Sequence, residues 1–270
     1  MKIRGIDVSQ FQGNINFADV KASGIDFVII RAGYGRYLSQ KDPWFEANYK
    51  KAKAAGLNVG AYWYSYAKNA SEALQEANVC LQAIKGKTFE MPIYFDLEEG
   101  GQFALGKSVC SAMVEAFCDR LENAGYFAGL YMSRSPIMQY ISDNVQKKYT
   151  LWIAEYGNGC AYKGSGVVDM WQFTSSLRIA GINGNVDGDV SYRDFPSVIK
   201  NGGYNGFPKP VKKAEEKKAS KPETKTEKPV EKKPSTEFER GDVNGDGKIN
   251  VTDITKLAAH IKGKKLLNDK

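Results

Sequence analysis

The chain has 270 residues and a net charge of +7, but the basic excess is unevenly distributed along it. Residues 1–208 carry 21 Lys and Arg against 20 Asp and Glu, whereas residues 209–240 carry 11 against 7. Because the positive charge lies mostly in a polar segment with almost nothing to bury, we do not expect nucleic-acid binding. All periodic apolar sequence precedes about Phe207, which predicts one large domain and a small C-terminal appendage.

Expected strands and helices alternate along residues 1–207. Short apolar runs bounded by Gly, Pro or polar residues predict strands, and longer segments that end at Gly predict helices. The expected strands cover residues 3–8, 26–32, 57–65, 91–99, 127–132, 149–154, 168–173 and 185–190. The expected helices cover residues 16–22, 43–55, 70–84, 108–124 and 133–141.

This order predicts an α/β fold with a parallel sheet and crossover helices. The second expected strand, residues 26–32, is nearly continuous in apolar residues, which is typical of a parallel strand buried on both faces. The number of strands favours closure into a TIM-like (β/α) barrel over an open sheet. Helices become sparse after Ile141, so we expect the barrel to be irregular.

Four acidic residues fall at or near expected strand ends. Asp7 ends the first strand, Asp96 and Glu98 follow the apolar run 91–95, and Asp187 lies in the last strand region. Residues two apart on a strand share a face, so Asp96 and Glu98 would enter one cavity, where repulsion and poor solvation raise a pKa. Since barrel strands end at one face, we expect all four acids in one pocket. The alternative for residues 91–99 is a strand that runs into an acidic surface turn.

The residue inventory limits the chemistry open to these acids. His260 is the only histidine and lies in the C-terminal segment, which excludes Ser-His-Asp, Cys-His and HExxH-type zinc sites from the large domain. Glycoside hydrolysis needs little more than two acids, and we expect no cofactor for catalysis. Aromatic rings near the strand ends are suited to pack against sugars. The residues expected to bind substrate are Tyr34, Tyr62, Tyr64, Tyr131, Trp152 and Trp171.

Cysteine spacing and hydropathy predict no disulfide framework and no membrane span. No stretch approaches the roughly 20 apolar residues of a membrane helix, and Met1-Lys2-Ile3-Arg4 leads directly into the first strand without a signal peptide. The cysteines are few, scattered and outside any CxxC pair, so buried thiols are expected. They are Cys80, Cys110, Cys118 and Cys160.

The C-terminal part divides into a linker and a calcium-loop pattern. Residues 208–240 are rich in Lys, Glu, Pro, Thr and Ser, and we expect a disordered spacer. Residues 241–270 place oxygen ligands at loop positions 1, 3, 5 and 12, a backbone carbonyl at 7 and Gly at 6, as a Ca²⁺ loop requires. An Asp replaces the usual bidentate Glu, and a chance Asp/Gly-rich turn is the alternative. The expected ligands are Asp242, Asn244, Asp246, Lys248 and Asp253.

The large domain resembles glycoside hydrolase family 25, whose members are muramidases (lysozymes of the Chalaropsis type). The resemblance covers roughly residues 2–200, with the motifs in family order. The motifs are Gly5-Ile-Asp7-Val-Ser-Gln-Phe-Gln-Gly13, Phe27-Val-Ile-Ile-Arg-Ala-Gly33, Gly60-Ala-Tyr-Trp-Tyr64, Ile93-Tyr-Phe-Asp96-Leu-Glu98, Gly129-Leu-Tyr-Met-Ser133, Leu151-Trp-Ile-Ala154, Trp171-Gln-Phe173 and Val186-Asp187.

The resemblance implies hydrolysis of peptidoglycan between N-acetylmuramic acid and N-acetylglucosamine. Glu98 would be the general acid, Asp96 its partner, and Asp7 and Asp187 supporting acids. The family is generally retaining, with the substrate acetamido group or a carboxylate as nucleophile. Asp189 departs from the neutral residue expected there. Two alternatives are a non-catalytic cell-wall carbohydrate-binding module and a related chitin-active barrel glycosidase.

Residues 242–262 resemble one repeat of a dockerin, a Ca²⁺-dependent module that attaches secreted bacterial enzymes to cohesin-bearing scaffolds. Dockerins normally have two repeats, so we expect a truncated half-dockerin here, an all-α, EF-hand-like unit. A cohesin partner would then require a second repeat encoded by a longer gene. The dockerin resemblance implies a secreted, extracellular enzyme.

Overall fold

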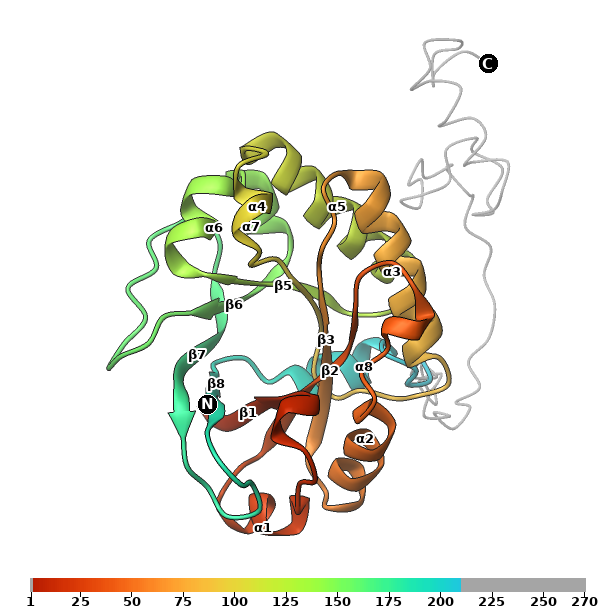
Figure 1. The fold of residues 1–270 in the computed structure, drawn as a ribbon, viewed down its shortest axis with the longest axis vertical. Helices are drawn as coiled ribbons and strands as arrows, with labels where there is room; N and C mark the ends of the chain where they lie inside the picture. Colours follow the sequence, from red (N-terminus) through yellow and green to blue (C-terminus); the bar gives the residue numbers. More distant parts are fainter. Residues whose placement is uncertain (1, 210–270) are drawn as a thin grey trace, which may run out of the picture. The chain divides into compact units, whose positions relative to one another are not determined.

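The computed structural model describes residues 2–209 of the chain, and within this range eight strands form a closed barrel in chain order (Figure 1). The strands are β1 (Ile3–Val8), β2 (Phe27–Tyr34), β3 (Asn58–Tyr64), β4 (Ile93–Asp96), β5 (Ala128–Ser133), β6 (Thr150–Ala154), β7 (Val168–Leu177) and β8 (Val186–Ser191). The helices are α1 (Phe17–Ala22), α2 (Phe45–Ala54), α3 (Ala70–Ile84), α4 (Gly100–Phe103), α5 (Lys107–Asn123), α6 (Arg134–Tyr140), α7 (Asp143–Lys148) and α8 (Phe195–Gly202), with 3-10 turns η1 (Gln10–Gln12) and η2 (Leu38–Gln40). The prediction of an α/β barrel is confirmed.

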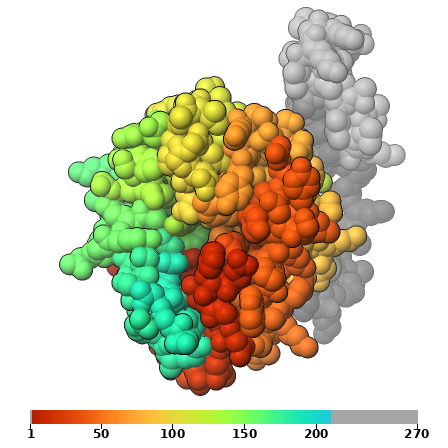
Figure 2. Space-filling model, in the orientation of Figure 1, coloured from red at the N-terminus to blue at the C-terminus, as the bar shows by residue number. Residues whose placement is uncertain are grey.

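The direction of the last strand differs from the prediction. Strands β1 to β7 run parallel to one another, but β8 is antiparallel to both β7 and β1. The connection 178–185 contains no helix and is shorter than the dozen or so residues that a parallel crossover needs. The wholly parallel sheet was therefore a wrong prediction. The β7–β8 ribbon lies beside the N-terminal strand, as Figures 1 and 2 show.

The expected helices are present, and the structure adds short ones that the sequence reading missed. No helix lies between β6 and β8, which makes the barrel irregular as predicted. Helices α4 and α7 are too short to show a helical period. Helix α8 is capped at its N-terminus by Asp194, whose Oδ1 accepts the Ser197 N–H, and at its C-terminus by Gly203 in the left-handed region. Its Phe195 and Ile199 belong to the apolar cluster inside the barrel.

Strand β2 is apolar at consecutive positions because both of its faces are buried. Phe27 and Ile29 belong to the cluster inside the barrel, whereas Val28 and Ile30 belong to the core between the sheet and the helices. All four side chains are fully buried. Because side chains alternate between faces, a strand covered on both sides needs apolar residues at every position. The next inward position is Arg31, where the interior changes from apolar to polar.

Gly5 in β1 allows a large side chain to fill the barrel. A Cβ atom built at this position would lie 2.2 Å from the ring of Phe27. Phe27 comes from the neighbouring strand, is paired in register with Gly5 and is completely buried. The absence of a side chain at Gly5 is therefore a packing requirement of the interior.

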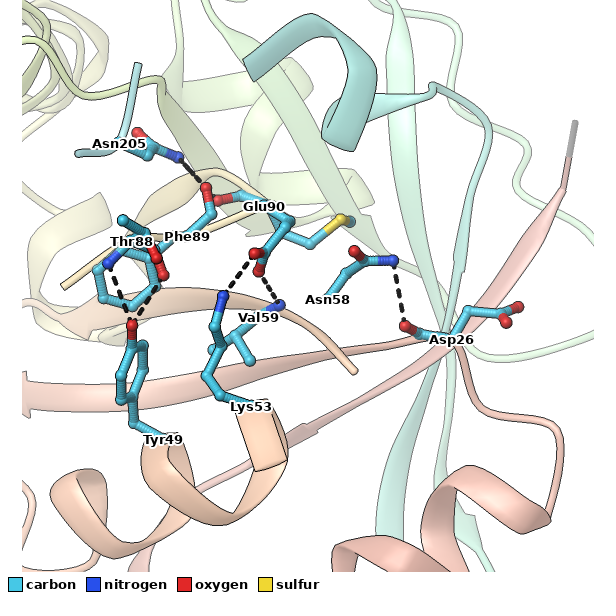
Figure 3. Close-up of polar contacts among 10 residues, drawn as sticks. Asp26, Tyr49, Lys53, Asn58, Val59, Thr88, Phe89, Glu90 and Asn205 are labelled. Carbon is cyan, nitrogen blue, oxygen red and sulfur yellow. Dashed lines mark hydrogen bonds and ion pairs between the residues drawn. The ribbon is translucent and has the colours of Figure 1, made fainter. Parts of the chain in front are cut away.

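Polar contacts fix the end of the barrel at which the parallel strands begin (Figure 3). Asn205 donates to the carbonyls of Phe89 and Met91, and its Oδ1 accepts the Phe127 N–H at 2.7 Å. Glu90 accepts the Val59 N–H and pairs with a lysine of α2. These contacts join segments that enter β3, β4 and β5, so they hold the strands in register from the end opposite their carboxyl termini.

Candidate active site

A cavity of about 260 Å³ opens where the parallel strands end. Its walls contain all four predicted catalytic acids and four of the six predicted aromatic residues. The lining residues are Asp7, Val8, Ser9, Phe11, Gln12, Arg31, Tyr62, Tyr64, Asp96, Glu98, Tyr131, Trp152, Tyr156, Gln172 and Asp187. The convergence of the acids that was expected from their positions near the strand ends is thus observed.

The four acids that line this cavity come from different parts of the fold. Asp7 and Asp96 lie at the ends of the parallel strands β1 and β4. Glu98 lies beyond the end of β4, in the segment before α4, so the prediction that it shares a strand face with Asp96 is wrong, although both residues line the cavity. Asp187 is near the start of β8 and pairs in register with Asp7. Because β8 is antiparallel, its beginning lies at the face where the other strands end.

Asp96 and Glu98 differ in environment. Asp96 is buried, and its Oδ1 has no hydrogen-bond donor among residues 2–209. Burial raises its pKa well above the usual value, and the nearby Glu98 carboxyl adds to this effect. Glu98 is exposed to water at the cavity wall, yet desolvation, Glu99 and Asp187 raise its pKa as well. Both residues therefore retain a proton at higher pH than free carboxylic acids do.

Asp7 and Asp189 form a buried carboxyl pair beside the cavity. Both side chains point inward from adjacent strands, and Asp189 is completely buried. Trp152 Nε1 donates to Asp189 Oδ1 at 2.9 Å, and Gln172 Nε2 donates to Asp7 Oδ2 at 2.8 Å. Burial raises the pKa of both carboxyls; the carboxyls of Asp189 and Asp187 raise that of Asp7 further, whereas the pKa of Asp189 is also raised by Asp187 and is lowered by its contacts with Trp152 and Asp7. We therefore expect the pair to retain a proton at pH values at which free carboxylic acids are ionised.

Asp187 completes the acid cluster. It is partly exposed and lies within the electrostatic reach of Asp7 and Glu98. Desolvation raises the pKa of Asp187 to about 6, so this carboxyl changes charge near neutral pH. The cavity therefore contains acids with distinct titration behaviour, which is the arrangement that acid catalysis requires.

Gln172 is a site residue that the sequence reading did not select. Its Oε1 accepts hydrogen bonds from Tyr131 at 3.0 Å and from Tyr156 at 3.3 Å, while its amide donates to Asp7. It therefore fixes two phenols and one carboxyl at once. The sequence did contain a signal for this residue. Side chains alternate between the two faces of β7, so Gln172 and Trp171 lie on opposite faces, and Gln172 could have been placed in the barrel interior.

Four of the six predicted aromatic residues line the cavity, and two do not. Tyr62, Tyr64 and Tyr131 line the cavity, and the Trp152 ring packs against Tyr62 and Tyr131 at its base. Tyr34 and Trp171 do not line it. Tyr34 borders an adjacent cavity, and the Trp171 indole donates to the Glu155 carbonyl at 2.7 Å.

Arg31 is a second residue that the sequence reading missed. Arg31 Nε donates to Asp42 Oδ2 at 2.8 Å, and the same oxygen accepts the Gln10 N–H. The guanidinium lies 5.0 Å from the ring centre of Phe11, which projects from η1 above it. This buried ion pair fixes the loop after β1 over the cavity. In the sequence, Arg31 is a single charged residue within an apolar run. No local pattern indicates that Asp42, 11 residues later, is its partner.

Residues 2–209 contain neither a membrane-spanning helix nor a metal-binding cluster. No helix in this range has both the length and the apolar character needed to span a membrane. Over the same residues, no group of three or more His, Cys, Asp or Glu is placed to hold a metal ion. The predicted calcium ligands Asp242, Asn244, Asp246, Lys248 and Asp253 lie outside the described residues.

Known proteins are similar to this chain in sequence and in fold. The chain is 32% identical over 189 residues to the autolytic lysozyme of Clostridium acetobutylicum, covering 69% of this chain and 55% of that protein. It is 27% identical over 203 residues to lysozyme M1 of Streptomyces globisporus, covering 68% and 66%. The modular autolysin LytC of Streptococcus pneumoniae, solved with a synthetic peptidoglycan ligand, aligns with a TM-score of 0.64 at 27% identity, covering 71% and 47%.

The chain thus spans about half the length of the autolytic lysozyme and of LytC. The sequence profile described as "Glycosyl hydrolases family 25" matches residues 6–182, which is more than half of the chain and extends from within β1 to beyond β7. From this match, the chain belongs to glycosyl hydrolase family 25.

Proposed function

We propose that the barrel is a peptidoglycan muramidase that hydrolyses the β-1,4 bond between N-acetylmuramic acid and N-acetylglucosamine. The observation that carries this proposal is the convergence of Asp7, Asp96, Glu98 and Asp187 in one aromatic-lined cavity. Membership of the family and the lysozymes among the similar proteins support the choice of substrate. No cofactor takes part in the proposed reaction.

Glu98 is the general acid in this proposal. Its exposed position allows contact with a bound glycan, and its raised pKa keeps the proton that must be transferred. As the bond from the anomeric carbon to the glycosidic oxygen breaks, Glu98 protonates that oxygen. The departing sugar leaves as an alcohol, and positive charge develops at the anomeric carbon.

Asp96 is the catalytic partner, and Asp7 and Asp187 support the site. In one retaining route, the acetamido oxygen of the substrate attacks the anomeric carbon while Asp96 orients that group. In the other, a carboxylate attacks directly. A thiazoline analogue of the cyclic acetamido intermediate separates the routes, because tight inhibition by it is expected only for the first.

The test is reducing-end release from purified peptidoglycan. The wild type should release muramic-acid reducing ends, and Glu98→Gln should reduce kcat by at least about 100-fold, the usual scale of general acid catalysis. Glu155→Gln, which removes a carboxyl outside the cavity lining, is the matched control. If neither the wild type nor the variant releases reducing ends but both bind peptidoglycan, the barrel is a non-catalytic carbohydrate-binding module and the muramidase proposal fails. Release from chitin alone would favour the chitin-active alternative.

We also propose that residues 242–253 bind Ca²⁺ within a single dockerin-like repeat of a secreted enzyme. The loop spacing in the sequence supports this. Calorimetric titration of the full chain with CaCl₂ should give one site, and Asp242→Asn with Asp246→Asn should abolish it. An unchanged titration in that double variant would contradict the proposal. A cohesin-bearing partner is proposed only for a chain with a second repeat.

A further inference from the structure

The backbone around Glu98 is held by hydrogen bonds, whereas its carboxyl is not. The N–H of Leu97, the residue before it, donates to the Tyr131 carbonyl of β5 at 3.2 Å. Within the described part of the chain, burial and neighbouring carboxyls act on the Glu98 carboxyl, but no hydrogen bond fixes it. The direction of this carboxyl therefore depends on the backbone on either side, and on the following side that backbone belongs to Glu99.

Gln102 of α4 holds the peptide group that follows Glu98. Its Oε1 accepts the Glu99 N–H at 3.3 Å, and its own N–H donates to the Glu99 carbonyl at 2.8 Å. The first bond fixes the orientation of the peptide plane between Glu98 and Glu99, because that N–H and the Glu98 carbonyl belong to one planar group. Gln102 is 3% exposed and does not line the acid cavity, so it does not touch a glycan bound there.

The amide nitrogen of Gln102 anchors this contact to the segment that follows β3. Nε2 lies 2.9 Å from the Ala67 carbonyl oxygen, and 3.3 Å and 3.2 Å from the carbonyl oxygen and Oγ of Ser65. A buried amide that is bonded at both ends cannot turn without leaving polar groups unpaired. The side chain thus joins the segment after β3 to the segment after β4, which carries Glu98.

Helices outside the barrel fix both partners of this contact. The buried Glu76 of α3 accepts the Tyr66 N–H at 2.9 Å, which holds the segment after β3 from the side opposite Gln102. The Cys110 thiol of α5 donates to the Gln102 carbonyl at 3.3 Å. The backbone at Glu98 is therefore connected to packed helices through one buried side chain.

We propose that Gln102 is a positioning residue for the general acid, because it holds the Glu98–Glu99 peptide group so that the Glu98 carboxyl faces the glycosidic oxygen. The inference rests on the proposed function and adds a residue that acts through Glu98 without contact with the substrate. Proton transfer needs the acid within hydrogen-bond distance of that oxygen, and a misplacement of about 1 Å can cost about 100-fold in rate. Loss of Gln102 should therefore affect catalysis and not substrate binding.

A double-mutant cycle with Glu98→Gln tests this inference. Gln102→Leu should lower kcat on peptidoglycan glycan strands about 10-fold or more and leave KM within about twofold. In the Glu98→Gln background, the same change should lower kcat less than about twofold, because the acid that it misplaces is already absent. If Gln102→Leu does not fold, Gln102→Asn, whose amide is carried on a side chain one methylene shorter, replaces it in the cycle.

Gln146→Leu is the matched control. Like Gln102, Gln146 is buried, at 1% exposed, and its amide is bonded to backbone carbonyls at Nε2 and to donors at Oε1. It lies outside the acid cavity and contacts neither Glu98 nor Glu99. Gln146→Leu should lower the urea midpoint by an amount similar to that of Gln102→Leu, and it should leave kcat within about twofold.

The outcomes separate this inference from the proposed function. Equal losses of kcat with and without the Glu98 carboxyl would overturn it, since the effect would not pass through the acid. No loss by Gln102→Leu, a loss in KM alone, or an equal loss by Gln146→Leu would overturn it as well. If the wild type releases no reducing ends, or if Glu98→Gln leaves kcat unchanged, the proposed function itself fails, and the positioning role fails with it.

Discussion

Replacing Asp189 by Asn should change how the stability of the protein depends on pH. In the wild type, burial raises the pKa of both Asp7 and Asp189, and we expect this pair to share one proton near neutral pH. In the unfolded chain both carboxyls ionise near their ordinary value of 3.8, so above about pH 5 they hold almost none. Folding therefore takes up one proton. Because the folded-state pKa is raised, this contribution to stability is largest at low pH and decreases as pH rises towards the folded pKa.

The expected change in the free energy of unfolding follows from the uptake of one proton on folding. Each pH unit removes about 1.4 kcal/mol from the free energy of unfolding, so the pair accounts for a loss of about 3 kcal/mol between about pH 5 and pH 7. In Asp189→Asn, the NH₂ group of the introduced amide can donate to Asp7, and its carbonyl can still accept from Trp152. Asp7 then loses a neighbouring carboxyl and gains a hydrogen-bond donor, so its folded-state pKa should fall and the uptake of a proton on folding should decrease, although burial still raises that pKa. Asp96, Glu98 and Asp187 remain in both proteins.

Urea unfolding of both proteins at pH 5, 6 and 7 measures this difference. The wild-type curve should fall more steeply than that of Asp189→Asn, by at most about 1.4 kcal/mol per pH unit. The infrared band of a protonated buried carboxyl at pH 7 should weaken in the variant. Asp143→Asn, which removes an exposed carboxyl from α7, controls for the loss of a charge. Parallel pH curves for wild type and Asp189→Asn would refute the shared proton.

Three further predictions concern the acid and the packing of the barrel. The muramidase rate should fall as pH rises through the raised pKa of Glu98. Because Glu99 raises that pKa, Glu99→Gln should move this falling limb of the pH–rate profile to lower pH, and an unmoved limb would contradict the assignment of Glu98 as the acid. Asn205→Ala should lower the free energy of unfolding by about 3 kcal/mol or more, since it leaves buried backbone groups unpaired, and a urea midpoint within error of wild type would contradict this. Gly5→Ala should lower it by about 1–3 kcal/mol through overlap with Phe27, and Gly100→Ala, where a Cβ atom meets open space, is its control in the same urea assay.

Local patterns in the sequence were sufficient for most of the fold. The apolar run of β2, the Gly-terminated helices and the alternation of strand and helix are each set by neighbouring residues, and they predicted the barrel. The same patterns placed Asp7 and Asp96 at strand ends, because a strand that ends in an acid can be read from one segment alone. Residues 210–270 lie outside the described structure, so the linker and the calcium loop stay predictions.

The sequence by itself thus determined the barrel and the acids that end its parallel strands, since both follow from short-range periodicity. Only the tertiary structure decided the direction of β8, which brings Asp187 to the site from the start of its strand. It also decided that Gln172 joins Asp7 to Tyr131, and that Asp189 lies buried against Asp7. These contacts join residues far apart in the chain, and their pKa values depend on burial that exists only after the barrel closes.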